Sequence, residues 1–367
     1  MRIAFLIFVL LHGLIHLLGF IKAFEFQNVR ALTMAISRPT GILWLAAAVL
    51  FVAYVLLFAT QSRYDWCIGL LAVILSQALI IMFWKDAKFG TISNIVVLIV
   101  TLVGLGSFQL RDEFAVRVRQ DFHSNNAVVT DLLTEKDIAH LPAPVQRFLR
   151  YTKSVGQPKV RNVRAEFTGG MRGAPNETYM PLHSIQYNFY QDPSRYFYMT
   201  ATKKGVPLAG LHFYQHRIAT FRVKLLNWFS VVDAKGDMMN QAETVTLLND
   251  MCFIAPAALI DPRITWELVN DTTTRAIFQN GNIKVSALLY FNQKDELVNF
   301  ISKDRYETDG KKYVSYPWAT PVEDYRMMNG YVLPSRAKLI YQRPGGDFTY
   351  GEFVYKDVRY NVDGWSE

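Results

Sequence analysis

The 367-residue chain is too long for one small domain, and its 39 Lys and Arg against 31 Asp and Glu give a net charge of +8. Beyond residue 110 basic and acidic residues alternate, which excludes the clustered positive charge of a nucleic-acid-binding protein. Cys67 and Cys252 lie far apart in the sequence, so we expect neither a disulfide framework nor a cysteine-based metal site.

Charge and hydropathy divide the chain into two parts. Residues 1–110 contain seven basic and three acidic residues and four long apolar segments, whereas the rest has the composition of a soluble protein. A membrane-spanning helix needs about 20 apolar residues. We therefore predict an α-helical transmembrane bundle of four helices. The first lacks a small-x-small cleavage site, and we expect it to be retained. The spans are residues 3–21, 41–60, 66–84 and 91–110.

The first span contains the stretch HGLIH. At about 100° per residue, His12, His16, Gly19 and Ala23 share one helix face. Small and polar side chains on one face are typical of helix packing in lipid, so we predict that both histidines hydrogen-bond across the bundle, with Gln77 as the main polar partner. The alternative is a metal, haem or proton-relay site, because an ionisable group in a span is a functional hypothesis by default.

Residues 111–133 are charged and partly amphipathic, and we predict that they connect the membrane part to a β-rich soluble domain of residues 134–367. Past residue 160 the hydrophobic period changes from helical to two, and short alternating segments run to the C-terminus. Turn signals such as Asn329-Gly330 separate them. The pattern predicts an α+β domain with a large, mostly antiparallel sheet covered by helices.

Three helices are predicted in this domain. Two short ones lie in TEKDIAHLPAPVQRFLRY, where Thr134 and Asp137 form a capping-box pattern. The third lies in DMMNQAETVTLLNDMCF, with Asn240 and Glu243 as its expected N-terminal cap.

Aromatic residues are concentrated in the predicted strands and around the third helix. One interpretation is a packed core between sheet and helices. The other is an apolar cavity for a lipid or acyl chain, because ligand pockets are lined mainly by apolar and aromatic side chains. The candidate lining residues are Tyr187, Phe189, Tyr196, Tyr198, Phe213, Trp228 and Trp266.

Two stretches resemble an uncharacterised bacterial family of unknown function: LPAPVQRFLRYTKSVGQPKVRNVR at residues 141–164, and the later part from DRYE to PWATPVEDYRMMNGYVLPSRAKLIY. The resemblance covers most of residues 134–367, and the four-helix membrane part looks like an N-terminal extension. The C-terminal strand pattern is also similar to the half-barrels of LolA/LolB-type lipoprotein carriers. That likeness implies a curved sheet around an apolar cavity and a domain outside the cytoplasm.

We therefore predict a membrane-anchored binding module of the bacterial envelope, for a lipid, an acyl chain or a lipoprotein. Lys and Arg tie on the two sides of the spans, so only the carrier resemblance places the C-terminal domain outside the inner membrane. The alternatives are a structural or signalling assembly protein with a filled core, and a redox or transport component using His12 and His16.

No catalytic motif is found. The chain has no G-x-S-x-G elbow, P-loop or dinucleotide fingerprint, so we expect a protein that is not an enzyme and needs no cofactor. The expected partners are the lipid bilayer and a hydrophobic ligand or envelope protein.

Overall fold

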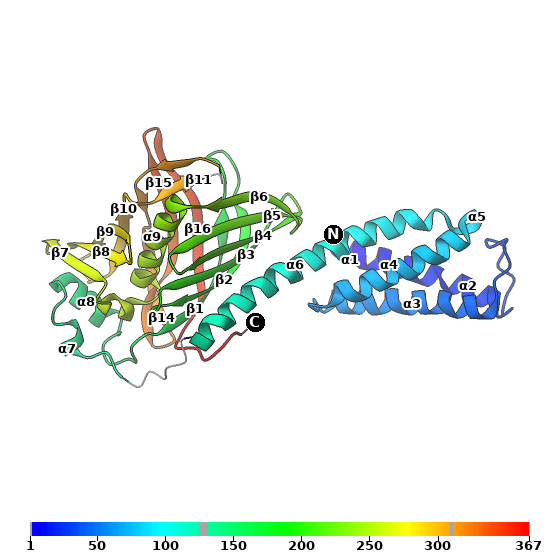
Figure 1. Cartoon of the computed structure of the whole chain (residues 1–367), viewed down its shortest axis with the longest axis horizontal. Helices are drawn as coiled ribbons and strands as arrows, with labels where there is room; N and C mark the ends of the chain where they lie inside the picture. Colours follow the sequence, from blue (N-terminus) through cyan, green and yellow to red (C-terminus); the bar gives the residue numbers. More distant parts are fainter. Residues whose placement is uncertain (1, 125–130, 309–310, 367) are drawn as a thin grey trace. The chain divides into compact units, whose positions relative to one another are not determined.

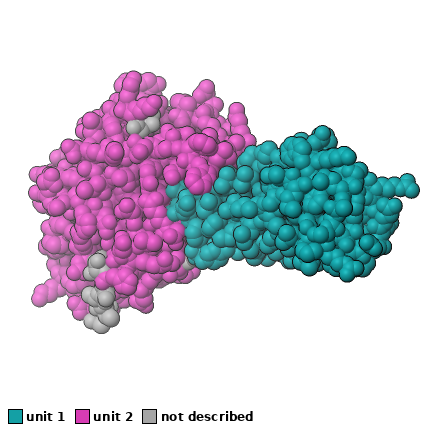
Figure 2. Space-filling view, turned by 45° about the vertical axis from the view of Figure 1, so that its right-hand side comes forward, with its two compact units in different colours: residues 1–110 teal, residues 111–367 magenta. Residues whose placement is uncertain are grey.

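The computed structural model describes residues 2–124, 131–308 and 311–366, which fall into two compact units (Figures 1 and 2). Unit 1 comprises residues 1–110 and unit 2 residues 111–367.

Unit 1 contains four helical segments that are long and apolar enough to cross a membrane. This confirms the predicted four-helix bundle. The first segment is broken at His16 into α1 and α2, and a short helix, α5, precedes the last. The helices are α1 (Arg2–Ile15), α2 (Leu17–Ala23), α3 (Arg38–Ala59), α4 (Asp65–Met82), α5 (Trp84–Ala87) and α6 (Gly90–Ser124).

Small residues bring the helices of unit 1 close together. A Cβ atom added to Gly19 would overlap the Trp44 ring, and one added to Gly41 would overlap the Cβ of Ala23. The small-residue face predicted for the first span therefore lies against α3, which is how close helix pairs form in lipid.

Helix α6 continues beyond the predicted span. Its residues 111–124 belong to unit 2, and they make up the first part of the predicted connector. Residues 125–130 of that connector lie outside the described residues.

Unit 2 is built on a 14-stranded sheet whose strands pair antiparallel and curl into a half-barrel around helix α9 (Asp237–Phe253) (Figure 1). The strand order is β6-β5-β4-β3-β2-β1-β16-β15-β13-β10-β9-β8-β7, and β14 pairs with β15. The predicted fold class is therefore confirmed. The strands are β1 (Asn162–Met171), β2 (Met180–Phe189), β3 (Ser194–Lys203), β4 (Val206–Gln215), β5 (Ile218–Leu225), β6 (Phe229–Lys235), β7 (Ile264–Asn270), β8 (Thr273–Asn280), β9 (Ile283–Phe291), β10 (Leu297–Ser302), β13 (Trp318–Ala319), β14 (Val322–Met328), β15 (Tyr331–Arg343) and β16 (Gly346–Tyr360). A separate two-stranded hairpin consists of β11 (Tyr306–Thr308) and β12 (Tyr313–Ser315).

Tight turns set the register of the hairpins. Asn329 and Gly330 both have positive φ between β14 and β15, as the turn signal predicts, and Leu226 and Asn227 have positive φ between β5 and β6. Two residues of positive φ match the right-handed twist of paired strands.

The predicted helices of unit 2 are present as α7 (Glu135–Ile138), α8 (Ala143–Tyr151) and α9, followed by the 3-10 helix η1 (Pro256–Ile260). The Thr134–Asp137 capping box is confirmed. The predicted cap of α9 is wrong. The helix begins at Asp237, because the Asn240 side chain accepts a hydrogen bond from the Ala219 backbone N–H at 2.7 Å, and Glu243 pairs with strand residues instead.

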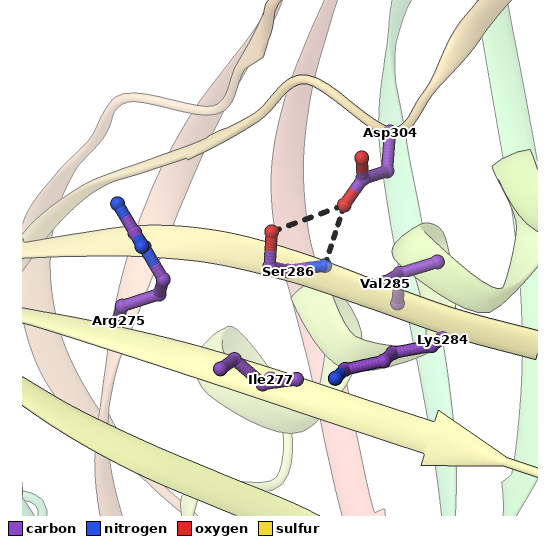
Figure 3. A pocket seen from close by; sticks show the side chains of 6 residues that line it. All are labelled: Arg275, Ile277, Lys284, Val285, Ser286 and Asp304. Carbon is purple, nitrogen blue, oxygen red and sulfur yellow. Dashed lines mark hydrogen bonds between the residues drawn. The ribbon is translucent and has the colours of Figure 1, made fainter.

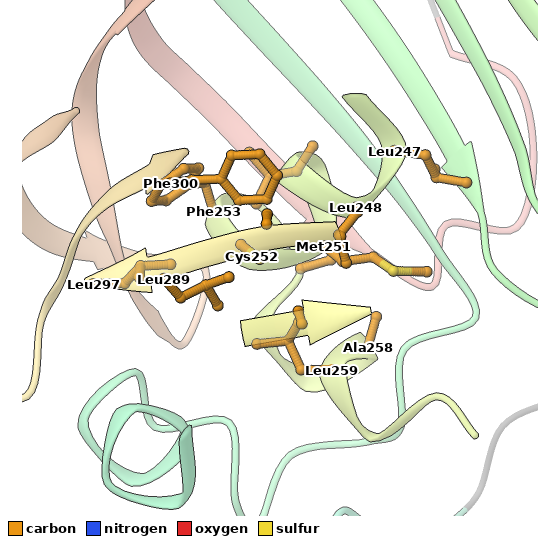
Figure 4. Close-up of a cluster of buried hydrophobic side chains, with 14 of the residues drawn as sticks. Leu247, Leu248, Met251, Cys252, Phe253, Ala258, Leu259, Leu289, Leu297 and Phe300 are labelled. Carbon is orange, nitrogen blue, oxygen red and sulfur yellow. The ribbon is translucent and has the colours of Figure 1, made fainter. Parts of the chain in front are cut away.

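The main hydrophobic core lies between α9 and the concave face of the sheet (Figure 4). Helix α9 is buried along most of its length, so it fills the hollow of the half-barrel. The apolar residues shown around it are Leu247, Leu248, Met251, Cys252 and Phe253 of α9, Ala258 and Leu259 of η1, and Leu289, Leu297 and Phe300 of β9 and β10.

Candidate functional site

Five of the seven aromatic residues predicted to line a cavity share the outer face of the sheet, opposite α9. They contact residues 111–124 of α6. The Phe114 ring is fully buried, with its centroid 5.7 Å from that of Tyr198 and 6.4 Å from that of Phe213. Phe122 lies 5.9 Å from Tyr187 and 5.0 Å from Phe189. The fifth, Tyr196, hydrogen-bonds to the same helix.

Asp121 fixes this helix to the sheet. Its carboxylate accepts hydrogen bonds from the Tyr196 hydroxyl at 2.9 Å, from Gln215 Nε2 at 3.0 Å and from the Ser194 hydroxyl. Burial, and then the Asp121 charge, raise the pKa of Tyr196, so its hydroxyl remains a donor. The Trp365 ring also lies against Phe114, at 5.3 Å. The chain's own residues therefore cover this aromatic face.

The other two aromatic candidates lie elsewhere. Trp228 is in the β5–β6 turn and 39% exposed. Trp266 is on β7, at the opposite end of the strand order, and packs partly buried against the main core. The structure thus brings five of the candidates together and separates Trp228 and Trp266 from them.

Trp228 belongs to an exposed apolar group at the end of the sheet. Phe229 is 65% exposed and Val231 51% exposed, and both lie on β6, which ends the strand order. Lys224 pairs in register with Ser230, between these two residues. We call Trp228, Phe229 and Val231 the edge patch. Exposed contiguous apolar side chains are typical of binding surfaces.

A buried network of charged side chains joins the inner face of the sheet to α9. Arg195 donates to Glu243 Oε1 and to Asp250 Oδ2, each at 2.7 Å, and to Gln186 Oε1 at 2.8 Å. His212 Nε2 lies 2.7 Å from Glu243 Oε2. The side chains of Arg195 and Glu243 are 7% and 0% exposed and that of Asp250 is 13% exposed, so the network is largely shielded from solvent.

The pKa shifts in this network follow from burial and charge. Burial alone would raise the pKa of Glu243, but His212 and Arg195 lower it to about 2. Burial lowers the pKa of His212 and raises that of Asp250. The geometry fastens α9 inside the half-barrel. Sequence analysis missed the network, although Glu243 and Asp250, seven residues apart, repeat on one face of an apolar helix.

A second cation lies in the same interior. The Arg305 guanidinium lies over the Trp318 ring at 4.4 Å, donates to the Tyr341 hydroxyl, and reaches Thr246 Oγ1 at 3.3 Å. Arg305 therefore adds a second positive charge to this interior, and that charge also helps to lower the pKa of Glu243.

Among the hollows on the described surface of unit 2, two contain charged side chains. One, of about 260 Å³, contains Asp304, which accepts hydrogen bonds from the Ser286 backbone N–H at 2.6 Å and from the Ser286 hydroxyl at 3.1 Å (Figure 3). Its other lining residues are Arg275, Ile277, Lys284 and Val285. The second, of about 510 Å³, lies at the β15–β16 turn and includes Arg343 and Phe348. Both have mixed polar and apolar linings.

The two histidines of unit 1 are buried, at 6% and 2% exposure. His12 Nε2 lies 2.9 Å from Asn94 Oδ1, and His16 Nε2 lies 2.8 Å from Ser76 Oγ. Asn94 Nδ2 in turn donates to Gln77 Oε1 at 3.0 Å. Polar groups from three of the spans therefore meet inside the bundle, and Gln77 reaches the histidines through Asn94.

His16 also explains the break between α1 and α2. Its backbone N–H bonds to Gly13 O at 3.1 Å, so the His12 carbonyl loses its helical partner. The Nδ1 atom of His16 takes that place at 2.9 Å. In residues 2–124, 131–308 and 311–366, no group of three or more His, Cys, Asp or Glu side chains is arranged to hold a metal ion.

Comparison with known proteins gives a family match and a distant structural similarity. Residues 131–353 match the family described as "Family of unknown function (DUF6544)", in agreement with the predicted resemblance. No curated protein matches the chain. Among solved structures, a DUF1329 family protein from Desulfovibrio piger is 11% identical, with a TM-score of 0.30 over 61% of this chain and 94% of that chain.

Proposed function

This chain belongs to the DUF6544 family, whose function is unknown, and we propose that it is a membrane-anchored binding module of the bacterial envelope. In this proposal four spans hold the protein in the inner membrane, and unit 2 binds the acyl chain of a lipid or lipoprotein at the edge patch. The observation that carries the proposal is the exposure of Trp228 in the β5–β6 turn and of Phe229 and Val231 on the last strand of the sheet, at 39%, 65% and 51%.

The filled interior supports this choice of surface. Helix α9 occupies the hollow of the half-barrel, and residues 111–124 cover the outer aromatic face. The proposal therefore places the ligand on exposed apolar side chains, those of the edge patch. An acyl chain in contact with these side chains gains about 25 cal/mol for each Å² of apolar surface removed from water.

A photo-crosslinking amino acid at Phe229, introduced into the full-length protein in bacteria, tests the proposal. We expect an adduct that carries the mass of a lipid or of a lipoprotein's acylated segment. The matched control is the same amino acid at Leu268, which is 59% exposed on β7, the other end of the sheet.

The outcomes separate the alternatives. An adduct with an unlipidated protein at position 229 would favour a structural or signalling assembly. Equal lipid adducts at positions 229 and 268 would show that any exposed apolar side chain is labelled, and would reject the edge patch as a site.

The location of unit 2 outside the cytoplasm is part of the same proposal, and the strand pattern similar to lipoprotein carriers supports it. We expect alkaline phosphatase fused after residue 367 to be active in cells and a green fluorescent protein at the same point to be dark. The opposite pattern would place unit 2 in the cytoplasm.

A further inference from the structure

With the Asn94 and Gln77 amides oriented as they are in the structure, the hydrogen bonds of His16 place a proton on both ring nitrogens. Nδ1 lies 2.9 Å from the His12 carbonyl oxygen, and a carbonyl can only accept, so Nδ1 carries a proton. Nε2 lies 2.8 Å from the Ser76 hydroxyl, which has one proton to give. The hydroxyl donates that proton to Asn94 Oδ1 at 3.1 Å. The bond between His16 and Ser76 therefore needs a second proton on the imidazole.

The Asn94 amide is oriented consistently with this count. Its Oδ1 atom faces both the Ser76 hydroxyl and, at 2.9 Å, His12 Nε2. Its Nδ2 atom donates to Gln77 Oε1 at 3.0 Å, and Gln77 Nε2 donates to the Thr91 hydroxyl at 3.2 Å. Every bond in this chain has one donor and one acceptor when His16 is doubly protonated.

The same side chains can also pair each hydrogen-bond donor with an acceptor when the network holds one proton fewer. If the amides of Asn94 and Gln77 turn over, Asn94 Nδ2 donates to His12 Nε2 and to the Ser76 oxygen. The Ser76 hydroxyl then donates to a neutral His16, and Gln77 donates to Asn94. Amide orientation and imidazole protonation are coupled choices in such networks. We infer that His12, His16, Ser76 and Asn94 form a proton-binding site inside unit 1, with His16 as the group that takes up and releases the proton.

Among the described residues, the side chains in contact with His16 are hydrogen-bonding groups and aromatic rings. The titratable neighbour on α1 is His12, α4 contributes Ser76, and α6 contributes Asn94. From α3 the Trp44 and Phe51 rings each lie 5.4 Å from the imidazole, between ring centroids. Aromatic faces within about 6 Å attract a cation. The carbonyl of His12, freed where α1 ends, also faces the charge.

This site goes beyond the proposed binding function, because it assigns unit 1 a ligand of its own. Polar and ionisable side chains that pair inside a membrane bundle are how proton relays are built. The proposal does not depend on the edge patch, and either one can fail while the other holds.

Nitrogen NMR of the full-length protein in lipid nanodiscs, with 15N-labelled histidine, tests this inference. The His16 signals are assigned from a His16→Gln variant. Between pH 8 and pH 4 we expect one protonation step at His16, with both ring nitrogens protonated on the acid side.

Three variants test whether the network controls this step. Ser76→Ala should uncouple His16 from Asn94 and move the midpoint of the step. Asn94→Asp cannot donate from its side chain, so it should hold the doubly protonated form to a pH higher by about 1–3 units. The matched control is Thr101→Ala, which removes another buried hydroxyl of the bundle, 3.4 Å from the Tyr54 hydroxyl, and should leave the step unchanged.

Several results would overturn the proposal. One is a wild-type His16 that keeps one protonated nitrogen throughout the pH range in folded protein, and this test needs no variant. Another is a step whose midpoint is the same in wild type, Ser76→Ala and Asn94→Asp. A third is stoichiometric Zn²⁺ binding by both imidazoles at neutral pH, which would make the pair a metal site.

Discussion

Both units bury a network of polar side chains, and the two networks balance their charges in different ways. In unit 2 a strand and a helix place the Arg195 guanidinium between the carboxylates of Glu243 and Asp250, each 2.7 Å away. In unit 1 the network is made of imidazole, hydroxyl and amide groups, and the proposed charge on it is a single proton. The difference reflects solvent, because a carboxylate in a membrane bundle is costly, whereas a soluble interior can enclose a complete set of counter-charges.

The comparison also predicts how the two networks fail. A buried ion pair that loses one partner leaves an uncompensated charge, and that destabilises a domain by about 3–5 kcal/mol. A hydrogen bond lost between helices in lipid costs about 0.6 kcal/mol on average. The network of unit 2 should therefore act as a structural requirement, and that of unit 1 as an adjustable one.

The largest effect is expected at Glu243. Glu243→Gln keeps the shape of the side chain but leaves Arg195 with one carboxylate, so we expect unit 2 to lose about 3–5 kcal/mol of unfolding free energy. Urea unfolding of the full-length protein in detergent, followed by circular dichroism of the β structure, measures it.

Arg147→Gln is the control, because the Arg147–Asp295 pair is about 40% exposed and should contribute about 0–1 kcal/mol. Equal losses in the two variants would mean that the buried network is no more important than a surface pair.

A second effect concerns the boundary between the units. Phe114 is fully buried, so Phe114→Ala should destabilise unit 2 by about 3 kcal/mol. Val116→Ala, on the same helix but 42% exposed, should change little. A fragment of residues 111–367 should accordingly unfold at higher urea than one of residues 123–367. If the two fragments are equally stable, residues 111–122 act as a connector and no more.

The stability of unit 2 should also depend on pH through His212. Burial lowers its pKa from 6.5, so the folded state binds fewer protons than the unfolded state. Stability is then complete above about pH 6.5 and decreases as the pH falls toward the lowered value. The carboxylate of Glu243, with its pKa of about 2, keeps its contribution until much lower pH.

The contribution of Asp250 to the pH dependence of stability has the opposite sign. Its pKa is raised in the folded state, so this contribution is lost as the pH rises. We therefore compare the urea midpoints at pH 7.5 and pH 5 with those of His212→Gln, which should flatten the difference. His183→Gln, at a histidine that is 46% exposed, is the control and should keep the wild-type difference.

Local patterns predicted the elements of this fold well. The capping box at Thr134 and Asp137 depends on residues three positions apart, and the turn at Asn329-Gly330 on adjacent ones. The predicted period of two is seen in β2, where Tyr187 and Phe189 lie two residues apart and both contact Phe122. Such signals are contained within a few residues, so one sequence suffices to find them.

The segments that pack on the two faces of the sheet in unit 2 could not be predicted in the same way. Glu243 fitted a cap pattern, but its partner Arg195 lies 48 residues earlier, on a strand whose position depends on the whole sheet. Residues 111–124 have the composition of a connector, because the charges on one side of the helix hide the role of Phe114 on the other. The predicted partner Gln77 was one residue from Ser76, which contacts His16 directly.

The smallest effect is expected in unit 1. Replacing His12 and His16 together by Leu removes the bonds to Asn94 and Ser76, which lie at 2.9 and 2.8 Å. At about 0.6 kcal/mol for each lost bond, and up to about 2, the bundle should weaken without unfolding unit 2. The helical circular dichroism signal on heating in detergent measures the stability of the bundle, and the β signal measures the stability of unit 2.

Visible absorbance and bound metal should be the same in the double variant as in wild type, because packing and proton binding need neither haem nor metal. A purified wild type that carries stoichiometric haem or transition metal, lost in the double variant, would contradict this expectation. The HGLIH stretch would then be a ligand pair, and the network of unit 1 would be as indispensable as that of unit 2.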